Sequence, residues 1–345
     1  MKVGNREKLR FAIIGAGVIS KSHIAAIQGD SEAELVAIAD SVAGKAEEKA
    51  AQHGIPQAYR EYEDMLRRDD IDAVSICLPS GMHADAVIAC AQAGKHVLCE
   101  KPLDITAEKM ERMIGECRRR GVKLGVVYQR RTLPSVIRAR EAIRQGELGK
   151  LVLGDVYMKY YRSPDYYRSA GWRGTWALDG GGALMNQGVH GVDLIQWLMG
   201  DVASVFAYSA ALAREVEVED TAVAAVRYKN GAFGIIQGAT TVYPELETRF
   251  EIHGERGSVT IGDGGVKSWK QLPDEPGAGV VAGAEPFAFD GSDSMQRGHA
   301  VLVRDLIEAI RDDREPMITG EEARKAVDLI LAIYESARTG REVRL

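Results

Sequence analysis

Over the first 128 residues, short apolar runs alternate with stretches in which apolar residues recur at helical spacing. Uniformly apolar runs are typical of parallel strands that are buried on both faces, and the intervening helices would connect them. The pattern therefore predicts an α/β region with about six parallel strands. The expected strands are residues 11–14, 34–39, a short piece near Ala58, 73–78, 97–99 and 123–128, with helices at 20–29, 42–53, 62–68, 83–93 and 107–120.

The pattern changes after residue 130, where strands follow one another with turns between them. Asn230-Gly231 lies between two apolar runs and is a strong hairpin signal. Adjacent strands joined by turns favour a largely antiparallel sheet. The expected strands are 151–161, 203–211, 221–229, 232–241 and 249–253, with helices at 135–145, 294–312 and 321–339 and a loop at 274–288.

Length and composition indicate two globular domains. A chain of 345 residues with 46% hydrophobic and 27% charged residues is too long for one ordinary core. We predict a first domain at 1–129 and a second at 130–345, whose last helices can pack back on the first. The net charge of −6 and the lack of a basic run argue against nucleic-acid binding.

The chain also lacks the features of exported and membrane proteins. No apolar run reaches membrane-spanning length, and the charged first ten residues do not fit a secretory signal. We therefore expect a cytoplasmic protein without a membrane partner. Neither disulfides nor a metal site is expected, because no Cys-x-x-Cys pair occurs among Cys77, Cys90, Cys99 and Cys117.

A glycine-rich turn follows the first expected strand and opens a helix. Gly15 permits the tight turn, and Gly17 lets a pyrophosphate approach the backbone at the helix start. Ser20 stands where a third glycine is usual, and it is small enough for close helix–strand packing. This context favours dinucleotide binding over an incidental turn.

Asp40 ends the second expected strand and sets the expected cofactor. Its carboxylate can accept hydrogen bonds from both ribose hydroxyls and would repel a 2′-phosphate. No arginine follows to neutralise such a phosphate, although Lys45 is near in sequence. We therefore predict NAD, with NADP as the less favoured cofactor.

Two further expected strands end in polar turns at the same edge of the sheet, where ligands bind in open α/β folds. The first leads to Leu78-Pro79-Ser80 and to His83, which either contacts the nicotinamide ribose or simply begins a helix. The second ends in Glu100-Lys101-Pro102, and the proline stops the strand. A lysine in a partly dry crevice would have a lowered pKa suited to proton transfer.

One segment of the second half carries a polar stripe. Three glycines at 180–182 precede an apolar helical stretch in which Asn186, His190, Asp193 and Trp197 would share one face. Gly188 within that stretch would cost helix stability, so something is expected to pack closely there. The stripe favours a site over ordinary core, and the three glycines either bind an anion or form a tight entry to the sheet.

These stretches together resemble the Gfo/Idh/MocA family of NAD(P)-dependent sugar and cyclitol dehydrogenases. The resemblance rests on residues 15–17, 79–83, 100–102, 180–193 and 333–341 and spans nearly the whole chain. It implies an α/β Rossmann domain followed by an α+β domain with a large open, mainly antiparallel sheet. It also implies a homodimer or homotetramer, often formed through those sheets.

The resemblance assigns roles to individual residues. The catalytic lysine of the family's Glu-Lys-Pro motif matches Lys101, and the family's Asp-x-x-x-His pair falls on Asn186 and His190, with an amide in place of the acid. The expected cofactor contacts are Gly15, Ala16, Gly17, Val18, Ile19, Asp40, Leu78, Pro79, Ser80, His83, Glu100, Lys101 and Gln129. The expected substrate contacts are Lys101, Tyr160, Trp172, Asn186, Gln187 and His190.

The implied reaction is oxidation of a secondary hydroxyl on a sugar, a cyclitol, an anhydrosugar or a nucleotide-linked sugar acid. His190 and Lys101 would handle the hydroxyl proton, in roles that they could exchange, and Asp193 could hold the His190 tautomer. Two alternatives are an NAD-dependent glycoside hydrolase working through a 3-keto sugar and a non-catalytic dinucleotide-binding regulator.

Overall fold

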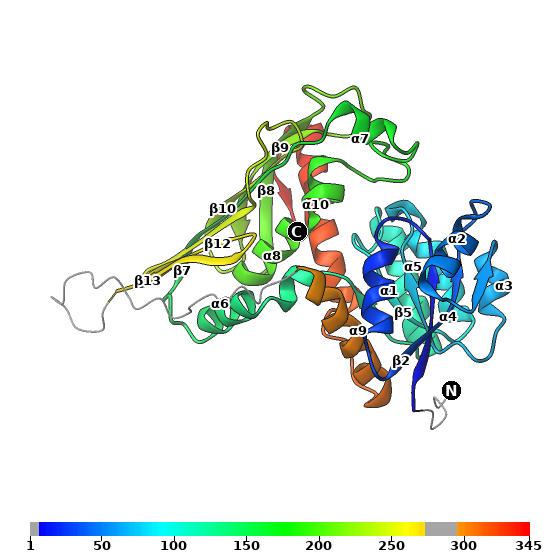
Figure 1. Ribbon diagram of the computed structural model, residues 1–345. Coiled ribbons are helices and arrows are strands. Elements are labelled where there is room, and N and C mark those ends of the chain that lie inside the picture. The colour runs from blue at the N-terminus through cyan, green and yellow to red at the C-terminus, as the bar shows by residue number, and fades with distance from the viewer. Residues whose placement is uncertain (1–6, 273–294) are drawn as a thin grey trace. The chain divides into compact units, whose positions relative to one another are not determined.

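The computed structural model describes residues 7–272 and 295–345, so the predicted loop at 274–288 lies outside the described residues. The chain divides into two compact units, and each is described by itself (Figure 1). The first comprises Met1–Gln129 with Met295–Arg324, and the second comprises Arg130–Ser294 with Lys325–Leu345.

The first unit contains a six-stranded sheet in the order β3-β2-β1-β4-β5-β6. Every strand pair in it is parallel, which confirms the prediction from the apolar runs. The strand order reverses direction between β1 and β4, the place where dinucleotides bind in folds of this topology. The strands are β1 Leu9–Ile14, β2 Ala33–Ala39, β3 Gln57–Tyr59, β4 Ala73–Ile76, β5 His96–Cys99 and β6 Leu124–Val126.

Helices connect these strands. Because the crossovers are right-handed, helices that lead toward β3 and helices that lead toward β6 cover opposite faces of the sheet. Helix α9 contacts α1 and β5, and α4 contacts α5. The helices are α1 Ser20–Gln28, α2 Lys45–His53, α3 Tyr62–Leu66, α4 His83–Gln92, α5 Ala107–Arg120 and α9 Met295–Arg311 (Figure 1).

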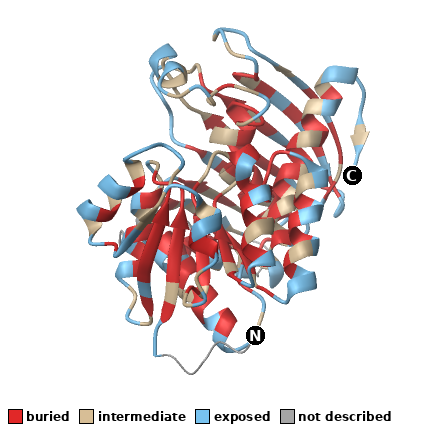
Figure 2. Ribbon diagram, turned by 90° about the vertical axis from the view of Figure 1, so that its right-hand side faces the viewer, coloured by how far each residue is buried: buried red, intermediate tan, exposed pale blue. Residues whose placement is uncertain are grey.

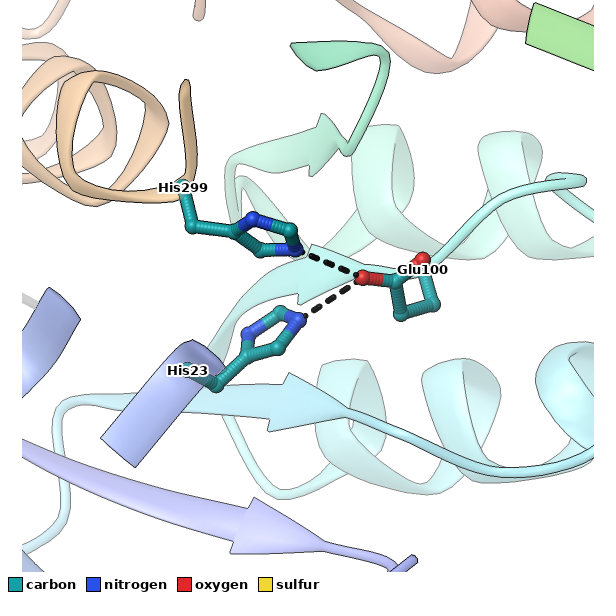
Figure 3. Close-up of side chains that lie close together, drawn as sticks. All are labelled: His23, Glu100 and His299. Carbon is teal, nitrogen blue, oxygen red and sulfur yellow. Dashed lines mark hydrogen bonds and ion pairs between the residues drawn. The ribbon is translucent and has the colours of Figure 1, made fainter. Parts of the chain in front are cut away.

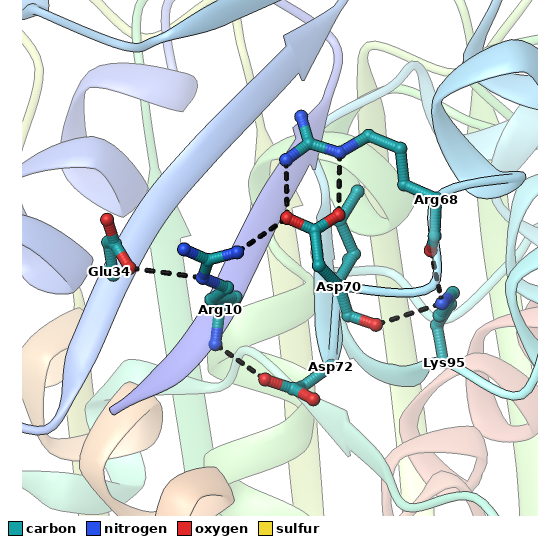
Figure 4. A network of polar contacts seen from close by, with 7 residues as sticks. Arg10, Glu34, Arg68, Asp70, Asp72 and Lys95 are labelled. Carbon is teal, nitrogen blue, oxygen red and sulfur yellow. Dashed lines mark hydrogen bonds and ion pairs between the residues drawn. The ribbon is translucent and has the colours of Figure 1, made fainter. Parts of the chain in front are cut away.

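The sheet core is apolar, and Figure 2 shows its strands as almost continuously buried. A polar network closes the edge near the start of β1 (Figure 4). Arg10 donates to Glu34 and Asp70, its backbone N–H donates to Asp72, and buried Lys95 donates to the carbonyl of Ile71. Hydrogen bonds already occupy this edge, so the opposite, carboxyl edge is the better place for a ligand.

The second unit contains an eight-stranded sheet in the order β13-β12-β11-β7-β10-β9-β8-β14. Its pairs are antiparallel except for β7 with β10, so the sheet is mixed and mainly antiparallel, as predicted. The pattern did not predict β12, β13 and β14. The strands are β7 Leu151–Lys159, β8 Val202–Ala210, β9 Thr221–Tyr228, β10 Phe233–Ala239, β11 Arg249–Gly254, β12 Gly257–Gly262, β13 Gly265–Gln271 and β14 Val343–Arg344.

Buried and exposed residues alternate along β9 and β10, so one face of this sheet is covered and the other is open. Helix α8 contacts β7 and β11, and α6 contacts β13 and α8. Helix α10 starts in the first unit and continues in the second. The helices first named here are α6 Pro134–Arg144, α7 Pro164–Arg168, α8 Val189–Met199 and α10 Gly320–Thr339.

The expected continuous helix around residues 183–197 is wrong in one respect. A π-helical turn, η3 (Ala183–Gln187), precedes α8, and Gly188 separates the two. A Cβ at Gly188 would lie 2.6 Å from the carbonyl oxygen of Ala183, and one at Gly191 would lie 2.3 Å from Sδ of Met158. The predicted close packing is therefore confirmed, but Asn186 belongs to a different element from His190.

All four cysteines are buried, and each is a free thiol. Burial raises the pKa of the Cys117 thiol to about 12, which keeps it protonated and unreactive at neutral pH. Among the helices of residues 7–272 and 295–345, none is long and apolar enough to cross a membrane.

Candidate active site

The glycine-rich turn of the first unit leaves room for a ligand. Gly15 has φ of +99°, and a Cβ there would lie 2.4 Å from the carbonyl oxygen of Cys77, so only glycine fits. A Cβ at Gly17 would meet nothing within 4 Å, and the backbone is open there. The hydroxyl of buried Ser20 donates to the Gly17 carbonyl (2.7 Å) and fixes the turn.

The start of α1 lies directly after this turn. Its N-cap residue is Ile19, whose apolar side chain cannot accept a hydrogen bond from the N–H groups of the first turn. Uncapped N–H groups at a helix start suit a pyrophosphate, and Val18 beside them is exposed. These features fit the dinucleotide predicted from the sequence.

Asp40 lies at the end of β2, beside the glycine turn. Its Oδ2 accepts the backbone N–H of Ala16 (2.8 Å), and its Oδ1 accepts that of Val42 (3.0 Å). The Lys45 ammonium lies 3.4 Å from Oδ2. A carboxylate offers about four acceptor positions, so capacity remains for ribose hydroxyls.

This geometry makes cofactor preference testable at Asp40. Asp40→Ser should lower kcat/KM for NAD by at least about tenfold, because a hydrogen bond to a charged group contributes about 1.5–3 kcal/mol. The same change removes the repulsion of a 2′-phosphate, so activity with NADP should rise. The measurement is kcat/KM with NAD and with NADP for wild type, Asp40→Ser and Asp40→Asn. If the ratio of the NAD value to the NADP value is the same in all three proteins, Asp40 does not select the cofactor.

His83 connects two loops at the carboxyl edge. Its Nδ1 lies 2.8 Å from the carbonyl oxygen of Pro102, and its Nε2 lies 2.9 Å from that of Leu78. The side chain is buried, and it ties the loop after β4, which includes Pro79 and the 3-10 turn η1 (Ser80–Met82), to the loop after β5. Contact of His83 with the cofactor stays a prediction.

Lys101 follows the last residues of β5 and is partly buried. Its backbone N–H donates to Oε2 of Glu100 (3.1 Å), and Glu100 itself is buried against His23 and His299 (Figure 3). Gln129 is buried three residues after the end of β6, at the start of the 3-10 turn η2 (Gln129–Thr132). The predicted cofactor residues therefore gather at the carboxyl ends of five strands of one sheet.

In the second unit, His190 lies in the first turn of α8 and is partly buried. Asn186 and Gln187 lie just before it in η3. The Asn186 side-chain amide donates to Asp179, and its Oδ1 accepts from Gln187 (2.7 Å). Asn186 stands at the position where the resemblance predicts an acid. The fold places the carboxylate of Asp179 against the side-chain amide of Asn186.

Further polar groups extend this network. The Gln187 amide donates to the Tyr166 hydroxyl (2.8 Å), and the Arg162 guanidinium donates to Gln187 Oε1 (2.9 Å). Burial raises the pKa of the Tyr166 hydroxyl, which therefore stays protonated at neutral pH. Amide, hydroxyl and guanidinium groups in one cluster can recognise several sugar hydroxyls.

The two aromatic residues predicted to contact the substrate, Tyr160 and Trp172, lie on either side of α7 in the sequence. The Tyr160 hydroxyl lies 3.0 Å from Thr248 Oγ1, and burial raises its pKa. The Arg173 guanidinium lies over the rings of Tyr166 (4.1 Å) and Trp172 (4.8 Å), which are cation–π distances. Within the described residues, the buried Nε of Arg173 has no hydrogen-bond partner.

Asp193 has a partner that the sequence did not reveal. Its two carboxylate oxygens accept from Arg131 Nε (2.9 Å) and Nη2 (2.6 Å), and both side chains are buried. This bidentate pair joins α8 to the start of the second unit. The structure thus pairs Asp193 with Arg131, and a role in orienting His190 stays a prediction.

The triple-glycine turn is a tight entry to the sheet. Buried Glu219 accepts the backbone N–H groups of Gly182 (3.0 Å) and Leu184 (2.8 Å) and the Tyr334 hydroxyl (2.8 Å). Burial raises the pKa of this carboxyl despite its three donors. A carboxylate of the protein itself occupies these N–H groups, so the anion-site interpretation of the turn is wrong.

Sequence reasoning missed Arg162, Tyr166 and Asp179. Arg162 directly follows the predicted strand at 151–161, and Tyr166 lies in the five-residue helix α7, which is too short for a helical period to show in the sequence. Asp179 directly precedes the three glycines, and this position was the available signal.

Comparisons with known proteins agree with these two halves. Residues 9–128 match the family GFO_IDH_MocA, described as oxidoreductase family, NAD-binding Rossmann fold. Residues 140–345 match the same family's C-terminal alpha/beta domain.

Individual relatives cover nearly the whole chain. The myo-inositol 2-dehydrogenase of Thermotoga maritima is 27% identical over 98% of both chains. The D-xylose 1-dehydrogenase (NADP(+)) 2 of Haloferax volcanii is 32% identical over 98% of this chain and 100% of its own. Among solved structures, the WlbA dehydrogenase from Bordetella pertussis in complex with NADH and UDP-GlcNAcA is 38% identical, with a TM-score of 0.87 over 98% of this chain and 99% of its own.

Proposed function

Because the chain belongs to the Gfo/Idh/MocA family of oxidoreductases, we propose that it oxidises a secondary hydroxyl of a sugar, sugar derivative or cyclitol with NAD as hydride acceptor. One observation carries the proposal. The chain combines an open glycine turn and Asp40 at the carboxyl edge of a Rossmann sheet with Lys101 at the same edge. The second unit adds His190 at the start of α8, which follows the η3 turn whose Asn186 and Gln187 belong to a network of amide, hydroxyl and guanidinium groups.

We propose the following catalytic roles. NAD held at the glycine turn and Asp40 would supply the hydride acceptor, and Lys101 and His190 handle the proton that the hydroxyl loses. The His190 imidazole accepts this proton, and the Lys101 ammonium donates a hydrogen bond to the same oxygen as negative charge develops on it. Lysine and histidine are both suited to either step.

We further propose that the substrate carries an anionic group, as in a nucleotide-linked sugar acid. The Arg162 and Arg173 guanidiniums lie in the polar cluster around Tyr166, and guanidinium binds carboxylate or phosphate with two hydrogen bonds. Arg162 already pairs with Glu245 (3.0 Å), so Arg173 is the main candidate. The related WlbA dehydrogenase holds UDP-GlcNAcA, which contains both kinds of anion. Free inositols and xylose would lack the groups that these arginines recognise.

A cofactor-reduction screen tests the proposal. The protein is incubated with NAD or NADP and with myo-inositol, xylose, an anhydrosugar, a UDP-hexose or the matching UDP-hexuronic acid, and NADH formation is followed by absorbance. We expect reduction of NAD, fastest with the hexuronic acid. No reduction with any compound, while NAD raises the Tm, would contradict a dehydrogenase and favour a regulator. Cleavage of glycosides without net reduction would favour the hydrolase.

We also propose that copies of this chain associate through the open face of the second sheet. Phe206, Ala225 and Ile235 lie opposite one another on β8, β9 and β10, and Phe233 lies opposite Leu153 of β7. Phe206, Phe233, Ile235 and Leu153 are exposed and form an apolar group that is typical of an interface, with Arg227 opposite Phe233 on the same face.

The oligomer is tested by light scattering after size exclusion. Wild type should elute as a dimer or tetramer, and Phe206→Asp with Phe233→Asp should shift it to smaller species because charge on the apolar face opposes association. An all-monomer wild type at micromolar concentration would contradict the interface.

The free, buried cysteines suit a reducing compartment, so we propose that the reaction takes place in the cytoplasm.

A further inference from the structure

Glu100 is the centre of a buried polar cluster behind Lys101. Its Oε1 lies 2.9 Å from Nε2 of His23 on α1 and 3.1 Å from Nε2 of His299 on α9 (Figure 3). Its Oε2 accepts the N–H of Lys101. The two imidazole rings meet edge to face at 5.1 Å. All three cluster side chains are almost completely buried.

The protonation states of the cluster follow from its geometry. Burial alone would raise the pKa of Glu100, but the hydrogen bonds and charges of His23 and His299 hold it well below its usual range. The carboxyl is therefore ionised and can only accept hydrogen bonds. Both imidazoles consequently donate through Nε2.

The cluster completes the backbone hydrogen bonding at the end of β5. The Glu100 N–H donates to the carbonyl oxygen of Ile76 on β4 (3.1 Å), and this is the last interstrand bond of the strand. The next N–H is that of Lys101, and the Glu100 side chain accepts it. Pro102 has no N–H, so the Glu100 carboxylate accepts the last backbone donor before it, and this bond restrains the peptide plane leading into Lys101.

The side chains of His23, Glu100 and His299 could also bind a metal ion, since their ligand atoms lie within 4.8 Å of one another. Histidines that bind metals nearly always donate their second ring nitrogen to a carboxylate or carbonyl. Among the residues that the structure describes, Nδ1 of His23 and Nδ1 of His299 have no hydrogen-bond partner. The donor set therefore suits a hydrogen-bonded carboxylate better than a metal centre.

We propose that Glu100, His23 and His299 are positioning residues that hold the Lys101 backbone for the reaction. The inference rests on the proposed function, in which Lys101 acts on the substrate hydroxyl. His23 lies one turn into α1, the helix that begins at the glycine turn, so the cluster also links the cofactor-binding turn to the lysine. Only an ionised carboxylate can serve both sides, because a glutamine has one acceptor and would present its amide N–H groups to either Lys101 or the two imidazoles.

Three variants test this role. His299→Gln keeps a donor near the Nε2 position, His299→Leu removes it at similar volume, and Glu100→Gln removes one acceptor. We expect His299→Leu and Glu100→Gln to lower kcat by about 10- to 100-fold through misplacement of Lys101, with His299→Gln closer to wild type. KM for NAD should change little. The control is His96→Leu, at the other end of the same strand, which should lower the Tm without lowering kcat.

Hydrogen exchange provides a readout that does not depend on activity. The Lys101 amide should exchange slowly in wild type and much faster in Glu100→Gln, while other β5 amides keep their protection. The inference would be overturned if His299→Leu had the same kcat as wild type, or if the Lys101 amide exchanged at the same rate in Glu100→Gln as in wild type. One equivalent of tightly bound metal in the purified protein would also overturn it. If wild type oxidises no substrate in the screen, the proposed function fails, and amide exchange alone then decides this inference.

Discussion

His190→Asn and Lys101→Met should each lower kcat by about 10²- to 10⁴-fold, the usual contribution of a positioned proton-transfer group. Asparagine keeps a polar side chain at position 190 but cannot take up a proton at neutral pH. Methionine keeps most of the length of lysine and loses its charge and its donors. Initial rates with the substrate identified by the screen measure both effects.

The pH profile assigns the two roles. If His190 accepts the proton, wild-type kcat/KM should fall at low pH, where the imidazole is protonated, and this limb should disappear in His190→Asn. If Lys101 accepts it, the limb should persist in His190→Asn and disappear in Lys101→Met. The control is His253→Asn, which makes the same substitution on β11 of the same unit, where the histidine contacts Ser258. Near-normal turnover of both site variants would show that neither residue takes part.

Arg131→Met should destabilise the protein by about 3–5 kcal/mol, the cost of leaving one charge of a buried pair without its partner. Asp193 is 1% exposed and Arg131 is 5% exposed, so water cannot compensate for the loss. Urea unfolding should therefore show a much lower midpoint for Arg131→Met and for Asp193→Leu. Because Asp193 and His190 belong to the same helix, we also expect activity to fall.

A double-mutant comparison separates the pair from general damage to the core. Arg131→Met with Asp193→Leu removes both charges and should be less destabilised than the sum of the single variants. Arg67→Met removes the exposed bridge to Asp64 and should change stability by less than about 1 kcal/mol. An Arg131→Met variant as stable as Arg67→Met would show that the buried pair contributes little.

The sequence determined the type of both sheets, although not the strands β12, β13 and β14, because the signals that it uses are local. Uniform apolar runs separated by helical periods specify a parallel sheet, and alternation with turns such as Asn230-Gly231 specifies an antiparallel one. The glycine turn could be interpreted for a similar reason, since Gly15 and Gly17 directly follow the first strand and Gly15 has a positive φ, which is a local requirement. The two motifs with Lys101 and His190 are likewise contiguous stretches.

Only the tertiary structure decided which polar groups meet. Asp193 takes Arg131 from 62 residues away, Glu219 closes the glycine turn from 37 residues away, and Glu100 takes His299 from 199 residues away. A buried carboxylate must be satisfied by whichever donors packing brings to it, and packing depends on the whole fold. The pattern of the chain shows that Glu100 and Asp193 lie on buried elements, but their partners are set by elements distant in sequence.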